Sequence, residues 1–387
     1  MIHPWEPGIK PRLFAPGPVE VPPQVLAAMA QPIIHHRTER FREIFLEVRR
    51  KLAEVACVPG EEVLVLSGSG SAALEAGLLG TVPKGSKVLA INAGKFGERW
   101  VRLAGAFAFE VVELKLDWGR AVKPEEVVAR LEAHPDVKAV LATHSETSTG
   151  VLHDIEGIAR AVKEKNAETL VLVDCVTSLG VAELRPPDWG IDAVLFGSQK
   201  GLMCPPGLAF AWLSERAWAS GDGLNPSFYL NLRKERNNQR QGQTAYTPAV
   251  SLVFALDAAL DMLLEEGLAG LWSRRERLNR AVIEGAEALG CRGYAERVSP
   301  AVAALAAPAG VKAADIVTGF AARGMRIAGG QDHAKPVLFR PSLMGYADRY
   351  DALALVTALE ETLRDLGQEV AYGQGVSAAM RLLADAA

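Results

Sequence analysis

The chain contains little cysteine, and the cysteines that it has are widely separated. Only four occur among its 387 residues, at Cys57, Cys175, Cys204 and Cys291. Their spacing matches neither a disulfide framework nor a zinc motif. We therefore expect small buried side chains at these positions and no metal site.

The chain also lacks a large charge of either sign and a long hydrophobic run. Its 42 Lys and Arg and 46 Asp and Glu leave a net charge of -4, which gives no electrostatic reason to expect a nucleic acid partner. No apolar stretch approaches the length that spans a bilayer, and no N-terminal segment combines a basic start with an apolar core. We therefore expect a cytoplasmic globular protein that contacts no membrane.

Short apolar segments alternate with amphipathic ones over the first half of the chain. The apolar segments have the length and β-branched content of buried strands. The alternation predicts a mostly parallel sheet of seven strands covered by helices. Strands are predicted at residues 63–66, 88–91, 111–114, 139–142, 170–173, 193–196 and 208–212, and helices at 41–55, 72–79, 97–106, 124–133 and 155–165.

The pattern changes after Pro248, where long helices replace the alternation. Helices are predicted at residues 250–266 and 268–289, and a mixed segment follows to about residue 366. We therefore predict an α/β protein in three parts. These are an N-terminal segment of residues 1–24, a large domain of residues 25–265 that holds the sheet, and a smaller C-terminal α+β domain of residues 266–387.

Two predicted strands lead to a charged residue at their carboxyl ends. Asp174 ends the run Leu-Val-Leu-Val-Asp, and Lys200 follows the next strand in Gly-Ser-Gln-Lys-Gly. In open α/β sheets, ligands bind at the edge where the strands end. A lysine that forms a Schiff base and an acid that keeps a proton on a pyridine nitrogen are what pyridoxal phosphate chemistry requires. Asp174 alone could simply cap a helix, but its combination with Lys200 favours a cofactor site.

A run of serine and glycine lies between a predicted strand and a predicted helix. Ser67-Gly68-Ser69-Gly70-Ser71 combines glycines that allow close backbone approach with a helix start that favours an anion. The run also nearly fits a dinucleotide fingerprint, which requires an acid about 20 residues further on. The next strand ends instead in Asn92-Ala93-Gly94. A cradle for the cofactor phosphate is therefore the favoured interpretation.

These motifs resemble those of the class V, fold-type I aminotransferases, which depend on pyridoxal phosphate. The resemblance is strongest to the serine–pyruvate and alanine–glyoxylate aminotransferases, and it extends from about Pro16 to the C-terminal helix. Three further motifs carry it: Thr-His-Ser-Glu-Thr-Ser-Thr-Gly at residues 143–150, Gly-Ser-Gln-Lys at residues 197–200, and Arg340 before Met344-Gly345.

The resemblance implies roles for individual residues. Lys200 would attach the cofactor and move a proton, Asp174 would hold the ring nitrogen, and Arg340 would grip the substrate carboxylate. Phe96 would stack on the ring, and Thr247 would reach the phosphate from a neighbouring subunit. The remaining cofactor-binding residues that it implies are Ser69, Gly70, Ser71, Thr147, Val176 and Gln199.

Two features leave alternatives open. His36-Arg37 either begins a surface helix or binds a substrate phosphate, as a similar pair does in phosphoserine aminotransferases. The residues after Arg340, Pro341-Ser342-Leu343, depart from the Ile-Gly pair that is usual in the family, which puts the shape of that loop in doubt.

The expected function is that of a homodimeric aminotransferase with a ping-pong mechanism. It would move an amino group from serine or alanine to glyoxylate or pyruvate. Phosphoserine with 2-oxoglutarate is the second choice of substrates. A cysteine desulfurase or lyase is less favoured, because Cys291, the only cysteine after residue 204, lies outside any Gly/Ser-rich loop.

Overall fold

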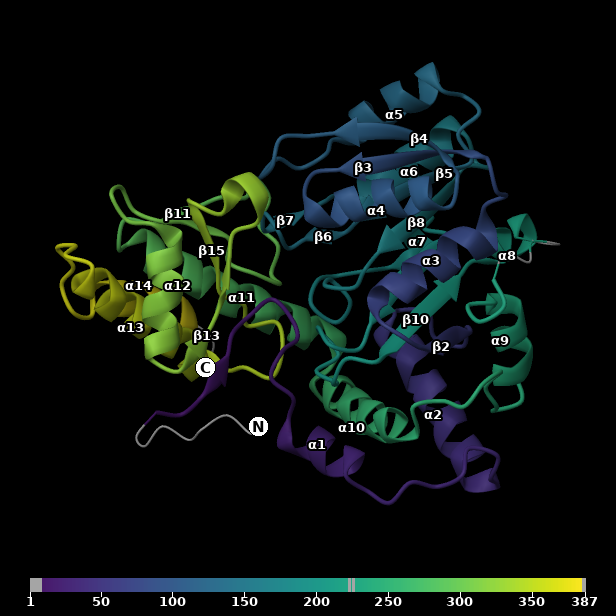
Figure 1. The fold of residues 1–387 in the computed structure, drawn as a ribbon, viewed down its shortest axis with the longest axis horizontal. Helices are drawn as coiled ribbons and strands as arrows, with labels where there is room; N and C mark the ends of the chain where they lie inside the picture. The colour runs from purple at the N-terminus through teal and green to yellow at the C-terminus, as the bar shows by residue number, and fades with distance from the viewer. Residues whose placement is uncertain (1–8, 222–223, 225–226, 385–387) are drawn as a thin grey trace.

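The structure is a computed structural model that describes residues 9–221, 224 and 227–384. Among these residues, a sheet of seven strands with helices on both faces forms the larger part of the molecule (Figure 1). All strands run in the same direction except β10, so the predicted mostly parallel sheet is confirmed. In order across the sheet, the strands are β2 (Val63–Ser67), β10 (Leu208–Leu213), β9 (Ala193–Gly197), β8 (Leu170–Asp174), β5 (Ala139–Thr143), β3 (Lys87–Asn92) and β4 (Glu110–Lys115).

Each central strand divides its side chains between two apolar layers. On β8, Val171 and Val173 face one layer while Leu170 and Leu172 face the other, and none is more than 2% exposed. A strand buried on both faces gives a continuous apolar run in the sequence. One face is covered by α3 (Gly70–Thr81), α4 (Lys95–Ala106) and α8 (Glu215–Ser220), and the other by α2 (Glu39–Val55), α5 (Pro124–Ala133), α6 (Ile155–Lys165) and α10 (Val250–Glu266).

The C-terminal part has an apolar core of its own and an antiparallel sheet of order β11-β12-β15-β14. Residues 12–14 join it, because β1 (Arg12–Leu13) pairs with β13 (Met325–Arg326) and Phe14 is buried in this core. Its other elements are α11 (Leu268–Glu287), β11 (Arg292–Gly293), β12 (Leu305–Ala306), α12 (Ala313–Ala322), β14 (Ala328–Gly329), η1 (Asp332–Ala334), β15 (Leu338–Arg340), α13 (Arg349–Asp365) and α14 (Gln374–Ala384).

Helix α11 passes from one core to the other. Leu271 packs in a core of the large sheet, whereas Leu278 packs in the C-terminal core. The domain boundaries at residues 24 and 265 stay predictions. None of the helices in the described part of the chain is long and apolar enough to span a bilayer.

Some elements differ from the predicted ones. Helix α1 (Pro23–Met29), which is not among the predicted helices, begins at a proline, because proline suits the first position of a helix. The apolar run at residues 335–339 predicts a strand that leads to Arg340, but β15 begins only at Leu338, since Pro336 has no amide hydrogen and Val337 N donates to Ala334 O in a turn. The remaining short elements are β6 (Ser145–Glu146), β7 (Val151–Leu152) and α7 (Pro186–Trp189).

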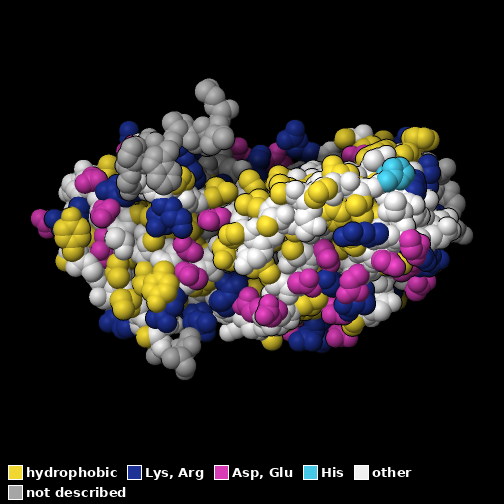
Figure 2. All heavy atoms as spheres, turned by 90° about the horizontal axis from the view of Figure 1, so that it is seen from below, with side chains coloured by type: hydrophobic (Ala, Val, Ile, Leu, Met, Phe, Trp, Pro, Cys, Tyr) yellow, Lys and Arg dark blue, Asp and Glu magenta, His cyan; other side chains and the backbone are white. Residues whose placement is uncertain are grey.

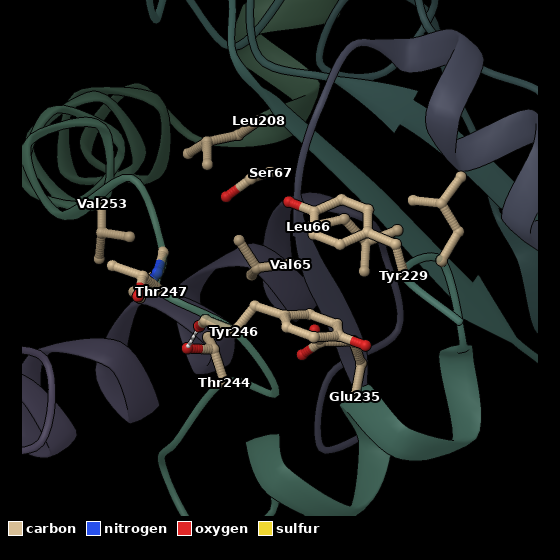
Figure 3. Close-up of a pocket in the computed structure, with 12 residues that line it drawn as sticks. Val65, Leu66, Ser67, Leu208, Tyr229, Glu235, Thr244, Tyr246, Thr247 and Val253 are labelled. Carbon is tan, nitrogen blue, oxygen red and sulfur yellow. Dashed lines mark hydrogen bonds between the residues drawn. The ribbon is translucent and has the colours of Figure 1, made fainter. Parts of the chain in front are cut away.

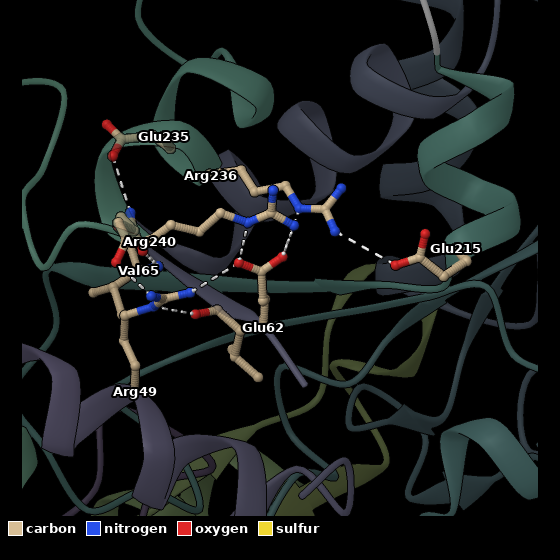
Figure 4. Close-up of polar contacts among 9 residues, drawn as sticks. Arg49, Glu62, Val65, Glu215, Glu235, Arg236 and Arg240 are labelled. Atoms are coloured by element: carbon tan, nitrogen blue, oxygen red, sulfur yellow. Dashed lines mark hydrogen bonds and ion pairs between the residues drawn. The ribbon is translucent and has the colours of Figure 1, made fainter. Parts of the chain in front are cut away.

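Helix α9 (Leu232–Gln239), which the sequence pattern does not predict, covers the edge of the sheet at β2. Val65 N donates to Gln239 Oε1 at 3.0 Å, and Gln239 Nε2 donates to Val65 O at 2.7 Å. Glu62 accepts hydrogen bonds from Arg236 and Arg240, which hold the helix in place (Figure 4). The amide of Gln239 thus replaces a neighbouring strand, and a helix this polar has no apolar periodicity to detect.

We expect Gln239→Leu to destabilise the protein, because it keeps the volume and removes both hydrogen bonds to Val65. A buried polar group that loses its partner costs about 1–3 kcal/mol. Urea denaturation measures the free energy of unfolding, and Asn237→Leu, an exposed position of the same helix, is the matched control. A loss no larger than that of the control would contradict the role of Gln239 at this edge.

Candidate active site

The structure brings Asp174 and Lys200 together at the carboxyl edge of the sheet. Asp174 ends β8, and Lys200 lies in the turn after β9, the neighbouring strand. They are 3% and 8% exposed. Burial lowers the pKa of Lys200 to about 8, although the charge of Asp174 acts in the opposite direction. A fraction of this amine is therefore unprotonated near neutral pH and can act as a nucleophile or a base.

The N-terminal segment packs against the side chain of Lys200. The Lys200 amine donates a hydrogen bond to Pro16 O. A Cβ atom on Gly17 would overlap Lys200 Nζ, and Gly17 has a φ of +111°, so only glycine suits this position. The motif Pro16-Gly17-Pro18 therefore lies against Lys200 and belongs to the candidate site.

Asp174 has two partners, one of which the sequence does not predict. Val176 N donates to Asp174 Oδ1 at 3.0 Å, and Arg99 Nη2 donates to Asp174 Oδ2 at 2.5 Å. Arg99 also lies over the ring of Phe96, at 5.0 Å from its centroid, and donates to Ser71 Oγ at 3.3 Å. The spacing of Phe96 and Arg99, three residues apart on α4, places them on one helix face and is the signal that could have identified Arg99.

The predicted phosphate cradle forms the start of α3. Ser69 is the N-cap residue, but its side chain makes no capping hydrogen bond, and Ser69 and Ser71 are exposed. The first amide groups of a helix have no partner within it, so they can bind an anion. A Cβ atom on Gly70 would overlap Val176 Cγ2, which explains the need for glycine here.

Gln199 connects the cradle with the lysine. Its Oε1 is buried and has no hydrogen-bond partner among the described residues. A Cβ atom on the neighbouring Gly197 would lie 2.9 Å from Gln199 Oε1 and 3.2 Å from Gly70 N, so these groups are closely packed. Because an amide can present either its oxygen or its nitrogen, Gln199 can donate to a phosphate. These groups fit pyridoxal phosphate. The uncapped start of α3 and the unpartnered amide of Gln199 suit its phosphate, and Lys200 and Asp174 suit its aldehyde and its ring nitrogen.

Glu146, which lies within a quoted motif but received no predicted role, anchors the start of α4. It is fully buried and accepts hydrogen bonds from Phe96 N and Gly97 N, both at 2.9 Å, and from Ser148 N at 3.2 Å. The pKa of its carboxyl group is raised, because the effect of burial exceeds the lowering by these hydrogen bonds. Glu146 therefore fixes the backbone of Phe96, the residue predicted to stack on the ring.

Arg340 lies at the end of β15 and is 5% exposed. Its Nε donates to Gly329 O at 2.9 Å and its Nη1 to Thr147 O at 2.6 Å. Burial lowers the pKa of Arg340 to about 10, so the guanidinium stays charged at neutral pH. The remaining hydrogens on Nη1 and Nη2 suit a carboxylate. Thr147, the predicted neighbour of the cofactor, is thereby held next to Arg340.

Three of the predicted site residues, His36, Arg37 and Thr247, form no hydrogen bond with Asp174 or Lys200 in the described structure. His36 and Thr247 line one cavity of about 590 Å³ beside α10, and Arg37 Nη1 donates to Gln243 Oε1 at 2.6 Å. Thr247 also lines a cavity with Ser67 at the end of β2 (Figure 3). Among the described residues, no hydrogen bond or ion pair joins His36, Arg37 or Thr247 to Asp174 or Lys200.

The cysteines are poor nucleophiles. Cys175, Cys204 and Cys291 are buried, and burial raises the pKa of Cys204 and of Cys291 to about 12. A reactive cysteine has a lowered pKa and access to solvent. Cys291 thus has the properties of a small core residue and not those that a desulfurase needs.

Comparisons with known proteins agree with this geometry. The family model described as aminotransferase class-V matches residues 13–351. A soluble hydrogenase small subunit from a Synechococcus species is 40% identical over 384 residues, 97% of this chain and 99% of the relative. A serine–glyoxylate aminotransferase from Methylorubrum extorquens is 30% identical, over 96% of this chain and 95% of the relative. The crystal structure of an aspartate aminotransferase of subgroup IV from Thermus thermophilus is 42% identical, with a TM-score of 0.86, and the match covers 92% of this chain and 99% of that one.

These comparisons confirm the predicted family, the predicted fold and the dependence on pyridoxal phosphate. They favour neither the phosphoserine alternative nor the desulfurase alternative. The individual site residues stay predictions.

We expect the attachment of pyridoxal phosphate to cofactor-free protein to become faster as the pH rises and to level off above about 8, the pKa of Lys200. Only the unprotonated amine attacks an aldehyde. With a lysine of the ordinary pKa of about 10.4, the attachment rate would still increase above about pH 9. Absorbance after rapid mixing follows the rate, and borohydride reduction with peptide mapping identifies the lysine. Attachment at Lys95, or a rate that still rises above about pH 9, would contradict the assignment.

Proposed function

The chain belongs to the class V aminotransferase family, and from that premise we propose that it moves the amino group of serine or alanine to glyoxylate or pyruvate. The observation that carries the proposal is the placement of buried Lys200 and Asp174 at one sheet edge, with Arg340 near enough for its charge to lower the pKa of Lys200. The serine–glyoxylate aminotransferase among the relatives supports the choice of donor and acceptor.

Bound pyridoxal phosphate supplies an electron sink for the electrons of the substrate Cα–H bond. We assign the proton transfer at Cα to the amine of Lys200, whose pKa of about 8 suits a base at neutral pH. The carboxylate of Asp174 would maintain positive charge on the ring nitrogen. The backbone of Ser69, Gly70 and Ser71 would hold the phosphate, with the help of Gln199.

Arg340 would orient the substrate through its α-carboxylate. Two of its nitrogens are already fixed by Gly329 O and Thr147 O, so little side-chain freedom is lost on binding. A guanidinium fixed in this way can bind a carboxylate with two parallel hydrogen bonds and place Cα close to Lys200. Every amino acid has this α-carboxylate, so the contact with Arg340 would not distinguish one donor from another. Other residues must select the donor by its side chain.

Aspartate is a second candidate donor. The relative from Thermus thermophilus, which is 42% identical, is named as an aspartate aminotransferase. A kinetic comparison of serine, alanine and aspartate separates the two candidates. The highest kcat/KM for aspartate would overturn the first choice.

We also propose a homodimer in which Thr247, His36 and Arg37 of one subunit complete the site of the other. The grouping of His36 and Thr247 around one cavity, apart from Lys200, supports this arrangement. Hydrophobic side chains gather on the underside of the molecule, where α1 and α10 lie, and Ile33 is 72% exposed (Figure 2). Exposed apolar patches of this kind are typical of interfaces. A cytoplasmic location stays a prediction.

We expect Arg340→Ala to reduce kcat/KM for serine, alanine and aspartate by a similar factor. Hydrogen bonds from a charged group contribute about 1.5–3 kcal/mol, so the reduction is at least about tenfold. Steady-state kinetics on the purified holoenzyme measures it, with Arg326→Ala, an exposed arginine of β13, as the control. A reduction for one donor only would mean that Arg340 contacts a side chain and not the common carboxylate.

We expect Thr247→Ala to weaken the binding of pyridoxal phosphate by about tenfold, the value of one charge-assisted hydrogen bond. Mixed dimers of Lys200→Ala and Thr247→Ala subunits would regain one tight site, because one pair of intact residues meets across the interface. Spectroscopic titration and sedimentation measure affinity and assembly. A monomer in solution, or mixed subunits without a tight site, would exclude the shared site.

A further inference from the structure

Arg275 is a buried cation that the proposed chemistry does not use. It lies on α11, is 1% exposed, and forms no ion pair with an acid among the described residues. Burial lowers the pKa of Arg275 to about 9. A buried charge without a counter-ion is costly unless its hydrogen bonds compensate.

The guanidinium of Arg275 bridges the two loops that follow β8 and β9. Its Nη1 donates to Gly180 O at 2.7 Å, and its Nη2 donates to Gly201 O at 3.1 Å. Gly180 lies six residues after Asp174, and Gly201 is the residue next to Lys200. The planar fork of arginine suits two acceptors at fixed positions, which a lysine could not bind in the same way.

The backbone around these contacts is tightly packed. A Cβ atom on Gly201 would overlap Leu179 O and would lie 2.7 Å from Val181 Cγ2 and 3.0 Å from Arg275 Nη1. The two loops therefore touch at the point where Arg275 joins them. A displacement of either loop would change the position of Lys200 relative to Asp174.

Arg275 also stands where α11 crosses between the two cores, between Leu271 of one and Leu278 of the other. One turn further on, Asn279 Nδ2 donates to Ser299 O at 3.0 Å, and Ser299 Oγ is 2.7 Å from Ser145 Oγ. The same face of α11 thus contacts the loops of Lys200 and, through Ser299, the loop that holds Glu146 and Thr147. This helix is the common support of both sides of the site.

We propose that Arg275 is a positioning residue that fixes Lys200 relative to Asp174 by clamping the loops after β8 and β9 to α11. It touches neither substrate nor cofactor. The inference rests on the proposed role of Lys200 as the attachment point and base. It predicts that the loss of the clamp impairs proton transfer for every donor to the same extent, because the contacts with the substrate are unchanged.

The test compares the parent with Arg275→Met, Arg275→Lys and Arg280→Met, all loaded with pyridoxal phosphate. Arg280 is an exposed residue of the same helix whose side chain lies near Glu284, so it controls for changes in helix propensity. Three readouts are needed: the thermal midpoint, kcat and KM for serine and alanine, and the pH midpoint of the absorbance of the cofactor attached to Lys200.

We expect Arg275→Met to lower kcat by at least about tenfold, because small misplacements of a catalytic group cost this much or more. KM should stay close to that of the parent. The pH midpoint should shift, because Lys200 would move relative to the charges of Asp174, Arg99 and Arg340, which act on its pKa. Arg275→Lys, which cannot bind the carbonyls of Gly180 and Gly201 in the same way, should restore neither kcat nor the pH midpoint fully, and Arg280→Met should resemble the parent.

Parent values of kcat and pH midpoint in loaded Arg275→Met would overturn the inference. If Arg275→Met does not fold, Arg275→Lys decides: a parent kcat in this variant would overturn the clamp. A lowered thermal midpoint with unchanged kcat and pH midpoint would assign Arg275 to stability alone and also overturn it. A parent protein that does not attach the cofactor at Lys200 would instead refute the proposed function.

Discussion

The burial of Lys200 and Asp174 is the constraint on which the remainder of the site depends. Buried charges are costly unless other groups of the protein solvate them. Asp174 receives hydrogen bonds from Val176 N and from Arg99, and the Lys200 amine donates to Pro16 O. These partners come from a loop, from α4 and from the N-terminal segment. The two buried groups therefore have hydrogen-bond partners from three separate parts of the chain.

The same constraint explains why the two parts of the molecule cannot be treated as independent. The N-terminal segment pairs through β1 with β13 of the C-terminal part, and a few residues later it lies over Lys200. Helix α11 makes a second connection, because Arg275 binds the loops after β8 and β9 from a helix that ends in the C-terminal core. The candidate site is formed by elements of both parts, although Asp174 ends β8 and Lys200 follows β9, both strands of the large sheet.

The sequence predicts what depends on local pattern and misses what depends on distant partners. The strand that ends at Asp174 follows from a continuous apolar run, because both of its faces are buried. Helix α9 is missed, since Gln239 stabilises it through the backbone of Val65, 174 residues away. Arg99 is missed for a related reason: its spacing from its neighbours on α4 is visible, but its partner Asp174 is 75 residues away. The family resemblance identifies the motifs in the sequence. The contacts that hold these motifs in position, such as that of Arg99 with Asp174, are visible only in the structure.

If Arg340 and Lys200 have the roles that we propose, the charges around Lys200 would also connect substrate binding with proton transfer. Burial is the main cause that lowers the pKa of Lys200; the negative charge of Asp174 raises it, and the positive charges of Arg99 and Arg340 lower it further. A carboxylate that binds to Arg340 offsets the charge of that arginine and so removes part of its effect on the amine. The proton affinity of Lys200 would then rise when a substrate is in place, at the moment when the amine must accept a proton from Cα. One arginine would thus orient the substrate and adjust the base, because both tasks follow from the same buried charge.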